Sequence, residues 1–276
     1  RFKIMNIYTK TLTLDYPVTV SPMGKIAGYP VRPGLFDING AMALPVGVNF
    51  TIHTHGGTRC ELLLFSPGEE KPYAVLPFPE EYKIGDVYSM IVYGLNIDEF
   101  EYAYRVDGPY CPEKGLLFNK NNVLLDPYAK AVAGQRTWGI RWDHTYHARV
   151  VKDTFDWGDV PQSKKELCDL IIYELHVRNF THHPSSGVQH RGTFAGLMEK
   201  IPYLKELGIN AVELMPIFEF DETMNARTVD GTQLLECWGY NTVSFFAPNS
   251  SYSSANEHNR EGTELKTLVR ELHANG

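Results

Sequence analysis

Short runs of alternating hydrophobic and polar residues fill the chain from about residue 46 to residue 133. Val48, Phe50 and Ile52 alternate with polar residues, and residues 88–93 and 100–106 are similar strand-like runs. Turn signals rich in glycine and proline separate these runs at residues 55–57, 66–68, 84–86 and 107–109. Several short strands divided by such turns are typical of an antiparallel β-sandwich.

The pattern changes after about residue 161. Residues 169–177 form a nearly continuous apolar run, which is typical of a strand that is buried on both faces. Residues 209–216 form a second run of this kind. Between the two runs, one helical face is marked by Leu197, Ile201, Leu204 and Leu207. Strand, helix and strand in this order predict a βαβ unit with parallel strands and a right-handed crossover.

Two breaker residues limit the helix between these strands. Pro202 interrupts the helical periodicity and predicts a kink or a new helical start. Gly208 predicts the C-terminal end of the helix. Another helix is predicted at the end of the chain, with one face formed by Leu265, Leu268, Val269 and Leu272.

Residues 217–259 lie between the second strand and the last helix. A structureless loop of this length is unusual in a compact domain unless it has a function. By pattern alone, residues 240–246 within it are a candidate third strand. The pattern leaves both interpretations open.

Composition excludes several classes of protein. The 276-residue chain has a formal net charge of −7 and no basic run, so it lacks the electrostatic signature of nucleic-acid binding. No apolar run reaches the length of about 20 residues that spans a membrane. Four widely spaced cysteines without a CxxC pair indicate reduced thiols in a cytosolic protein, rather than disulfides or zinc. Residues 1–4 contain no secretory signal, although an initiator Met is also missing.

Several motifs, taken in order, resemble one enzyme family. They are Tyr-Arg-Val-Asp-Gly-Pro at 104–109, Leu-Leu-Asp-Pro-Tyr-Ala-Lys at 124–130, Phe-Asp-Trp-Gly at 155–158, and the segments 171–181, 192–208, 212–217 and 238–248. This set resembles isoamylase-type glycogen or starch debranching enzymes, which are members of the α-amylase superfamily, glycoside hydrolase family 13. The resemblance covers the chain from about residue 28 to its end.

The resemblance implies a multi-domain β + α/β fold. Residues 1–160 would form an N-terminal immunoglobulin-like β-sandwich, a glucan-binding-type module of carbohydrate-binding module family 48. Residues 161–276 would form the first two βα units of a catalytic (β/α)8 TIM barrel, truncated before strand three, with the boundary within residues 155–165. In relatives, the segment at 240–246 lies in the loop after the second strand, and residues 264–274 form the second barrel helix.

The resemblance also implies a reaction. The parent enzyme would hydrolyse α-1,6 branch points in glycogen, amylopectin or limit dextrin with retention, in a bacterial cytoplasm and without an organic cofactor. Its nucleophile, acid/base and supporting Asp would follow barrel strands beyond Gly276, so we assign no catalytic residue within this chain. The alternatives are a glycogen branching enzyme, a maltooligosyltrehalose trehalohydrolase, or a non-catalytic glucan-binding protein if the product ends at Gly276.

Trp238 and Tyr240 are the candidate substrate-binding residues. An aromatic face packs well against the apolar face of a glucose ring, and relatives use the loop after strand two in their sugar site. The alternative is that both rings form the core of the loop. Cys237 stands where many relatives have Tyr, and a thiol does not stack on a sugar as a phenol does.

The other polar candidates have structural interpretations that we favour. Glu174 and His176 share a strand face and are expected to be a buried structural pair, and Glu213 is expected to be structural as well. His182 and His183 are expected in a solvent-exposed loop, because adjacent residues point apart and do not form a metal site.

The acidic residues after the second strand raise the question of calcium. Glu219, Asp221 and Glu222 are expected to form a solvated acidic loop, although some isoamylases bind calcium near this position. We therefore predict no metal site and leave calcium as a less favoured alternative. In the sandwich, Tyr88, Tyr93, Tyr102 and Tyr104 are expected to be core residues rather than a binding platform.

Overall fold

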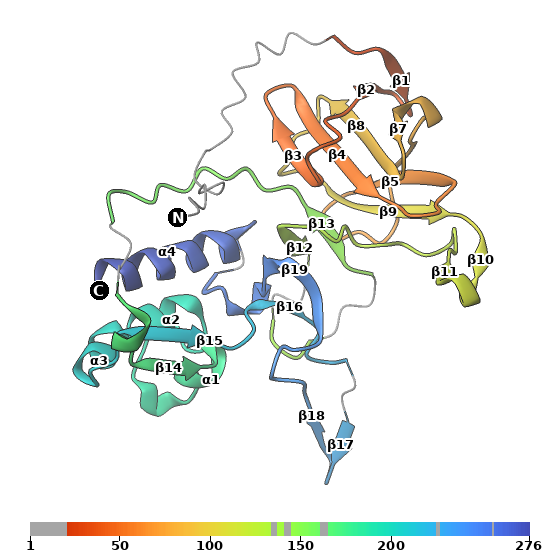
Figure 1. The fold of residues 1–276 in the computed structure, drawn as a ribbon. Coiled ribbons are helices and arrows are strands. Elements are labelled where there is room, and N and C mark those ends of the chain that lie inside the picture. Colours follow the sequence, from red (N-terminus) through yellow and green to blue (C-terminus); the bar gives the residue numbers. More distant parts are fainter. Residues whose placement is uncertain (1–20, 134–136, 141–144, 161–164, 225–226, 256) are drawn as a thin grey trace.

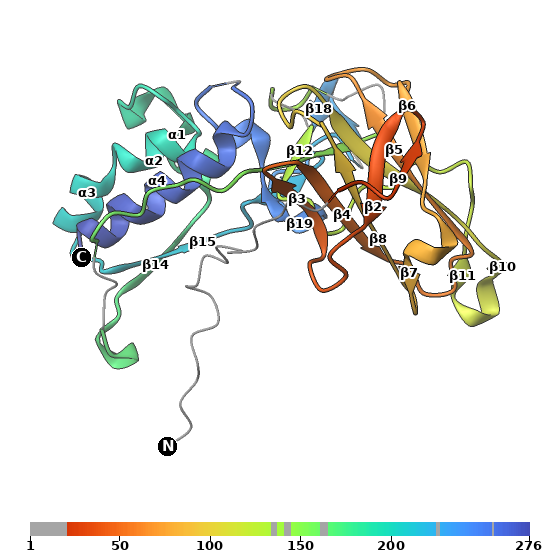
Figure 2. The same ribbon diagram turned by 90° about the horizontal axis from the view of Figure 1, so that it is seen from above.

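A computed structural model describes residues 21–133, 137–140, 145–160, 165–224, 227–255 and 257–276 (Figure 1). Residues 1–20 of the predicted first domain, and residues 161–164 at the predicted start of the second, lie outside the described residues. In the view from above, the strands of the first part lie to one side and the helices of the second part to the other (Figure 2).

The first part consists of two antiparallel sheets. One sheet contains, in spatial order, β1 (Gly24–Ile26), β2 (Tyr29–Pro33), β8 (Val87–Tyr93), β4 (Gly47–His53) and β3 (Gly40–Leu44), with β7 (Lys83–Ile84) also paired to β8. The other contains β12 (Ala131–Ala133), β13 (His147–Arg149), β9 (Glu101–Asp107), β5 (Arg59–Phe65) and β6 (Ala74–Pro77). A small hairpin is formed by β10 (Tyr110–Cys111) and β11 (Leu116–Leu117). We call the two sheets together the sandwich.

One hydrophobic core joins the inner faces of the two sheets. Phe50 from β4 meets Tyr102 from β9 edge to face, with ring centroids 5.2 Å apart. Tyr88 and Tyr104 are fully buried in the same core, which confirms that these tyrosines are core residues. The alternation read from the sequence is therefore the alternation of inward and outward side chains in the sandwich.

The second part contains the predicted βαβ unit. Strand β14 (Ile172–Leu175) pairs in parallel with β15 (Ala211–Leu214). The helices are α1 (Val177–His182), α2 (Phe194–Met198), α3 (Ile201–Glu206) and α4 (Arg260–Ala274). Pro202 lies in the first turn of α3 and separates it from α2, and Gly208 has a φ of +84°, so both predicted breaks are confirmed. We call residues 165–276 the strand–helix part.

Two expectations for the first parallel strand are wrong. The strand ends at Leu175 because the ring of His176 accepts a hydrogen bond from the backbone N–H of Asn179, 3.1 Å away, and caps α1. The strand is also not buried on both faces, since Ile172 is 53% exposed. The described residues place apolar packing on one face of this strand pair only.

Residues 217–259 are mostly structured. Strand β16 (Phe218–Phe220) pairs antiparallel with β19 (Thr242–Pro248), and β17 (Arg227–Val229) forms a hairpin with β18 (Thr232–Leu234). The candidate third strand is thus a strand, but it lies outside the parallel pair, as the family resemblance implies. Helix α4 begins at Arg260, four residues before its predicted start.

Short 3₁₀ turns complete the described elements. They are η1 (Glu80–Tyr82), η2 (Pro112–Lys114), η3 (Leu167–Asp169), η4 (Pro184–Ser186) and η5 (Ser250–Tyr252).

Helix α4 joins the two parts. Arg149 at the end of β13 forms a buried ion pair with Glu261 in the first turn of α4, with nitrogen and oxygen 2.6 Å apart. Farther along the helix, Lys266 pairs with Asp153 at 2.6 Å. The segment that leaves the sandwich therefore runs along α4, as Figure 1 shows.

Candidate functional site

The candidate site lies where the parallel strands end. In parallel α/β sheets, ligands bind at the carboxyl ends of the strands. Here β14 leads into His176, and β15 leads into the connection that contains Trp238 and Tyr240. We call residues 235–241 the Trp238 loop.

His176 anchors the Trp238 loop to the end of β14. Its Nδ1 accepts from the backbone N–H of Asn179, so the proton resides on Nε2. The Nε2 group donates to the backbone oxygen of Cys237 at 2.5 Å and lies 3.2 Å from the hydroxyl of Tyr252. Burial lowers the pKa of His176, which favours the neutral ring that these contacts require. His176 is therefore a buried structural residue, as predicted.

Glu236 and Gly239 shape the turn of the loop. The carboxylate of Glu236 accepts from the backbone N–H groups of Trp238, at 2.8 Å, and Gly239, at 3.2 Å. Gly239 has a φ of +81°, and a Cβ at this position would lie 3.2 Å from Phe220 and Pro216. Only glycine adopts this conformation readily in so close a contact.

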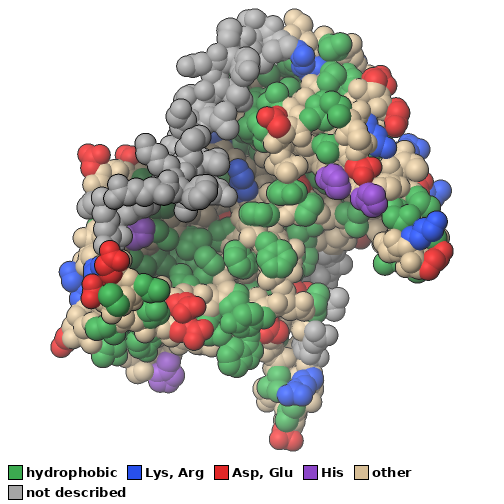
Figure 3. Space-filling model, viewed as in Figure 1, with side chains coloured by type: hydrophobic (Ala, Val, Ile, Leu, Met, Phe, Trp, Pro, Cys, Tyr) green, Lys and Arg blue, Asp and Glu red, His purple; other side chains and the backbone are tan. Residues whose placement is uncertain are grey.

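The turn leaves both aromatic side chains of the loop facing outward. Trp238 is 61% exposed and Tyr240 is 68% exposed. The alternative that they form the core of the loop does not fit these exposures, and their role as sugar contacts stays a prediction. In the view of Figure 3, hydrophobic side chains gather between the two parts of the molecule.

The expectation of a solvated acidic loop is wrong for two of the three residues. Glu219 and Glu222 are fully buried, because β16 and the turn after it fold beneath residues 249–252. One oxygen of Glu219 accepts from the backbone N–H of Ser250 at 2.9 Å. Burial raises the pKa of Glu219 to about 8 and that of Glu222 to about 7. The pattern of polar residues gave no sign of this burial, since acidic residues in loops are usually solvated.

The other two glutamates of the strand pair are exposed. Glu174 and Glu213 are directly paired in the register of β14 and β15, so they lie on the same face. Neither is buried, and the expected buried pair of Glu174 with His176 does not exist. His176 has left the strand to cap α1.

A metal site in the part of the chain that the structure describes would need several His, Cys, Asp or Glu side chains close together. No group of three or more His, Cys, Asp or Glu residues there is arranged to hold a metal ion. Glu219, Asp221 and Glu222 belong to no such group among these residues. His182 and His183 likewise belong to no such group among these residues.

The first domain matches a known module. Residues 39–129 match carbohydrate-binding module 48, the isoamylase N-terminal domain. The matched range covers most strands of the sandwich, from the region of β3 and β4 to the segment before β12.

The similarity to isoamylases extends beyond this module into the strand–helix part. The chain is 37% identical over 252 residues to the chloroplastic isoamylase SU1 of Zea mays, and 33% identical over 270 residues to the GlgX homolog of Mycobacterium tuberculosis. These matches cover 86% and 89% of the chain. A glycogen debranching enzyme of Serratia proteamaculans is 31% identical over 266 residues. The chain spans only 31%, 36% and 38% of these relatives, respectively.

Solved structures show the same fold. A pullulanase from Paenibacillus barengoltzii, solved with maltotetraose, has a TM-score of 0.66 and 25% sequence identity, and the match covers 87% of this chain and 36% of that one. A group B Streptococcus pullulanase solved with maltotetraose has a TM-score of 0.68 at 23% identity, with 88% and 32% coverage.

Several residues that contact the Trp238 loop or its anchor His176 were not among the candidates from the sequence. Glu236 accepts a hydrogen bond from the backbone of the loop, the hydroxyl of Tyr252 lies 3.2 Å from Nε2 of His176, and Trp138 packs against Tyr252. Glu236 could have been found as a carboxylate two residues before Trp238. Trp138 carries no such signal, because it lies a hundred residues earlier in the sequence.

Proposed function

We propose that this chain is the N-terminal part of a debranching enzyme that hydrolyses α-1,6 branch points in glycogen, amylopectin or limit dextrin. The observation that carries this proposal is the similarity to isoamylases and debranching enzymes over both the sandwich and the strand–helix part. A carbohydrate-binding module alone would not account for the similarity of residues 165–276. The domain boundary near residue 160 is part of the proposal.

We infer that the strand–helix part belongs to a (β/α)8 barrel. Its parallel strand pair has helices on one face, while Ile172, Glu174 and Glu213 are exposed on the strands. Strands of such a barrel are covered on both faces and paired on both edges. In a complete barrel, further strands and helices would cover the exposed face of β14 and β15 and pair with their outer edges.

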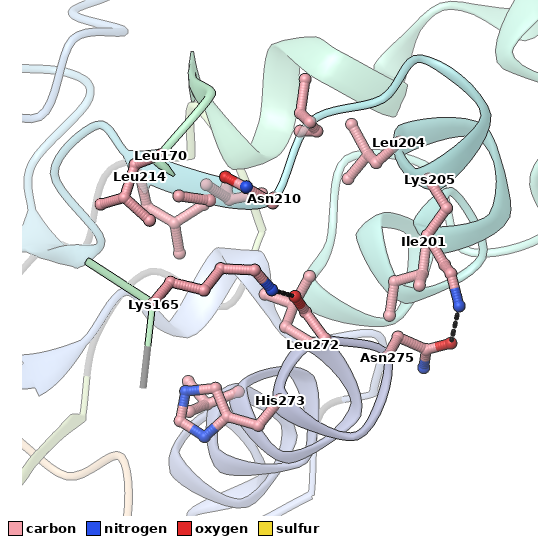
Figure 4. Close-up of a pocket in the computed structure, with 15 residues that line it drawn as sticks. Lys165, Leu170, Ile201, Leu204, Lys205, Asn210, Leu214, Leu272, His273 and Asn275 are labelled. Atoms are coloured by element: carbon pink, nitrogen blue, oxygen red, sulfur yellow. Dashed lines mark hydrogen bonds between the residues drawn. The ribbon is translucent and has the colours of Figure 1, made fainter. Parts of the chain in front are cut away.

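A pocket beside β15 supports the same inference. It has a volume of about 440 Å³ and is lined largely by apolar side chains from β15, α3 and α4, among them Leu204, Leu214 and Leu272 (Figure 4). Lys165 and Lys205 close it through hydrogen bonds to Gly276 and Asn275. A further barrel strand beside β15 would cover this apolar surface.

The proposed mechanism assigns binding, rather than bond cleavage, to the residues of this chain. A retaining glycosidase needs two carboxyl groups about 5–5.5 Å apart, one as nucleophile and one as acid/base. We place both beyond Gly276 and assign no catalytic role to Glu174 or Glu213. Trp238 and Tyr240 would offer exposed ring faces to glucose units, while His176 and Glu236 hold their loop in place.

The proposed substrate and location follow from the relatives. The two pullulanase structures contain maltotetraose, which supports α-glucan binding here. We propose the cytoplasm of a bacterium as the location, although the maize relative is chloroplastic. In the described residues, no helix has the length and apolar character to cross a membrane.

The experiment uses the enzyme encoded by the complete gene. We expect linear maltooligosaccharides to be released from glycogen and amylopectin, and linear amylose to be left intact. New branches would indicate a branching enzyme instead, and release of trehalose would indicate a trehalohydrolase. The chain 1–276, assayed alongside, should show no hydrolysis; if it cleaves branch points, the placement of the carboxyl groups is wrong.

A further inference from the structure

Residues 137–140, which lie between β12 and β13 in the sequence, contact the strand–helix part. Trp138 lies in this connection, between two strands of one sandwich sheet. Its ring nevertheless packs against the hydrophobic cluster of the strand–helix part, which includes Phe220 and Tyr252. A residue of the first domain is thus built into the core of the second.

Three side chains surround the Trp138 ring. The Arg178 guanidinium lies 4.2 Å from the ring centroid. The Tyr252 ring is nearly parallel to it, at 6.2 Å and 14°, and Phe220 meets it edge to face at 5.8 Å and 77°. Aromatic and cation–π contacts of this kind are directional, so they fix the positions of the rings as well as burying area.

Tyr252 connects Trp138 to the Trp238 loop. Its hydroxyl lies 3.2 Å from Nε2 of His176, and the same nitrogen donates to the backbone oxygen of Cys237. Cys237 directly precedes Trp238. Direct contacts therefore run without a gap from the sandwich connection to the loop with the exposed aromatic rings.

Gly139 makes a second contact with the same loop. It has a φ of +76°, and a Cβ on it would lie 2.5 Å from Cδ1 of Leu235. The backbone beside Trp138 thus lies directly against the first side chain of the Trp238 loop. Two neighbouring residues of the sandwich connection support the loop, one through Tyr252 and one through Leu235.

We propose that Trp138 is a positioning residue for glucan binding, through which the sandwich holds the Trp238 loop in its binding conformation. The proposal rests on the proposed function, because Trp238 and Tyr240 must contact glucan for the position of their loop to matter. It assigns the first domain a part in the binding site that does not require the sandwich to bind glucan itself.

The test compares Trp138→Ala and Trp138→Phe in the full-length enzyme. We expect Trp138→Ala to weaken maltotetraose binding about tenfold and to raise KM for branched glucan by a similar factor. The kcat should change less than KM, because the reacting carboxyl groups lie elsewhere. Trp138→Phe keeps a ring beside Tyr252 and should restore most of the affinity. Binding is measured by calorimetry well below the Tm of each variant.

Two matched pairs of variants distinguish a loss of loop positioning from a general loss of stability. Trp157→Ala removes a half-exposed tryptophan of the linker and should leave affinity unchanged. Gly139→Ala should weaken binding, whereas Gly68→Ala, which has a similar φ of +79° but open space around it, should not. If Trp138→Ala fails to fold, the Gly139 pair decides the matter.

An unchanged affinity per folded molecule in Trp138→Ala, with only a lower Tm, overturns the inference. The wild-type enzyme separates this failure from that of the proposed function. If it binds maltotetraose without cutting branch points, the debranching assignment fails, while the ratio between variant and wild type still tests Trp138. Lack of maltotetraose binding by the wild type would overturn both.

Discussion

The sandwich and the strand–helix part bury their apolar strands differently. In the sandwich, two sheets face each other, and inward residues such as Phe50 and Leu62 are fully buried. In the strand–helix part, β14 and β15 are covered on one face, and Ile172 remains 53% exposed. A sandwich needs only its two sheets, whereas a strand meant for a barrel needs a second layer and two neighbours.

This difference predicts unequal resistance to proteases in the chain 1–276. We expect limited proteolysis to cut first near residues 159–165 and then to degrade the strand–helix part, while the sandwich persists. The sandwich closes a core of its own, whereas the strand–helix part leaves one face of β14 and β15 open, with Ile172 exposed on it. Mass spectrometry of the resistant fragment measures its end. Equal resistance up to Gly276 would show that the contacts of α4 stabilise both parts as one unit.

The buried ion pair between the two parts should carry the largest effect of a single substitution. Glu261→Ala leaves the Arg149 guanidinium buried without this carboxylate and should cost about 3–5 kcal/mol in the free energy of unfolding. Lys266→Ala, which breaks the more exposed pair with Asp153, should cost about 0–1 kcal/mol. Urea denaturation of both variants measures the difference. Equal effects would mean that the two parts are not held together by Glu261.

A pair of alanine substitutions compares the strands directly. Leu62→Ala in β5 should cost about 2–5 kcal/mol, because it opens a cavity in a closed core. Ile172→Ala in β14 should change the stability of the chain 1–276 by about 0.5 kcal/mol or less, since much of this side chain is in water. In the full-length enzyme, we expect the cost of Ile172→Ala to rise toward that of Leu62→Ala. A cost that stays small there would argue against the barrel.

The buried carboxyl of Glu219 predicts a pH dependence that is specific to the strand–helix part. Its pKa of about 8 in the folded chain exceeds the ordinary value of 4.5, so folding favours the protonated form. This contribution is complete below pH 4.5 and is lost as the pH rises toward 8, with a slope of up to about 1.4 kcal/mol per pH unit. Glu219→Gln, which cannot ionise, should remove the part of the slope that Glu219 contributes. Glu222, whose pKa is raised to about 7, should still contribute a slope of the same sign below that pH.

Denaturation between pH 5 and pH 9 tests the substitution. The matched control is Glu213→Gln, which removes an exposed carboxylate from β15. If Glu219→Gln and the wild type lose stability in parallel as the pH rises, Glu219 is not the group responsible.

Trp238→Ala should have the smallest effect on stability and a clear effect on binding. The ring is 61% exposed, so its removal should change the free energy of unfolding by less than about 0.5 kcal/mol. In the full-length enzyme, loss of one stacking contact should weaken glucan binding by about 1–2 kcal/mol. A lower Tm with unchanged activity per folded molecule would instead make Trp238 a structural residue of the loop.

The sequence correctly predicted those strands and helix ends that depend on a local pattern of residues. The alternation through Val48, Phe50 and Ile52 located β4, and Pro202 and Gly208 marked real breaks between elements. The local pattern was wrong for residues whose burial depends on segments far away in the sequence. Glu219 was expected in water, but residues 249–252 fold over it.

The end of β14 likewise depends on a contact that the local sequence pattern does not show. The sequence pattern predicts one strand over residues 169–177, because the pattern reflects side-chain polarity and does not show which groups form hydrogen bonds. The strand stops at Leu175 because the ring of His176 caps the next helix and reaches across to Cys237. No local pattern contains the second of these contacts, which joins residues 61 positions apart.

The sequence by itself determined the sandwich and the parallel order of the two later strands, because these follow from local periodicity. The candidates Trp238 and Tyr240 came from the family resemblance, and their role stays a prediction. Tertiary structure alone decided that Trp238 and Tyr240 face outward and that Trp138 packs against Tyr252. It also decided that Glu219 and Glu222 are buried. Burial depends on which segments come to cover a side chain, and those segments lie tens to a hundred residues away in the chain.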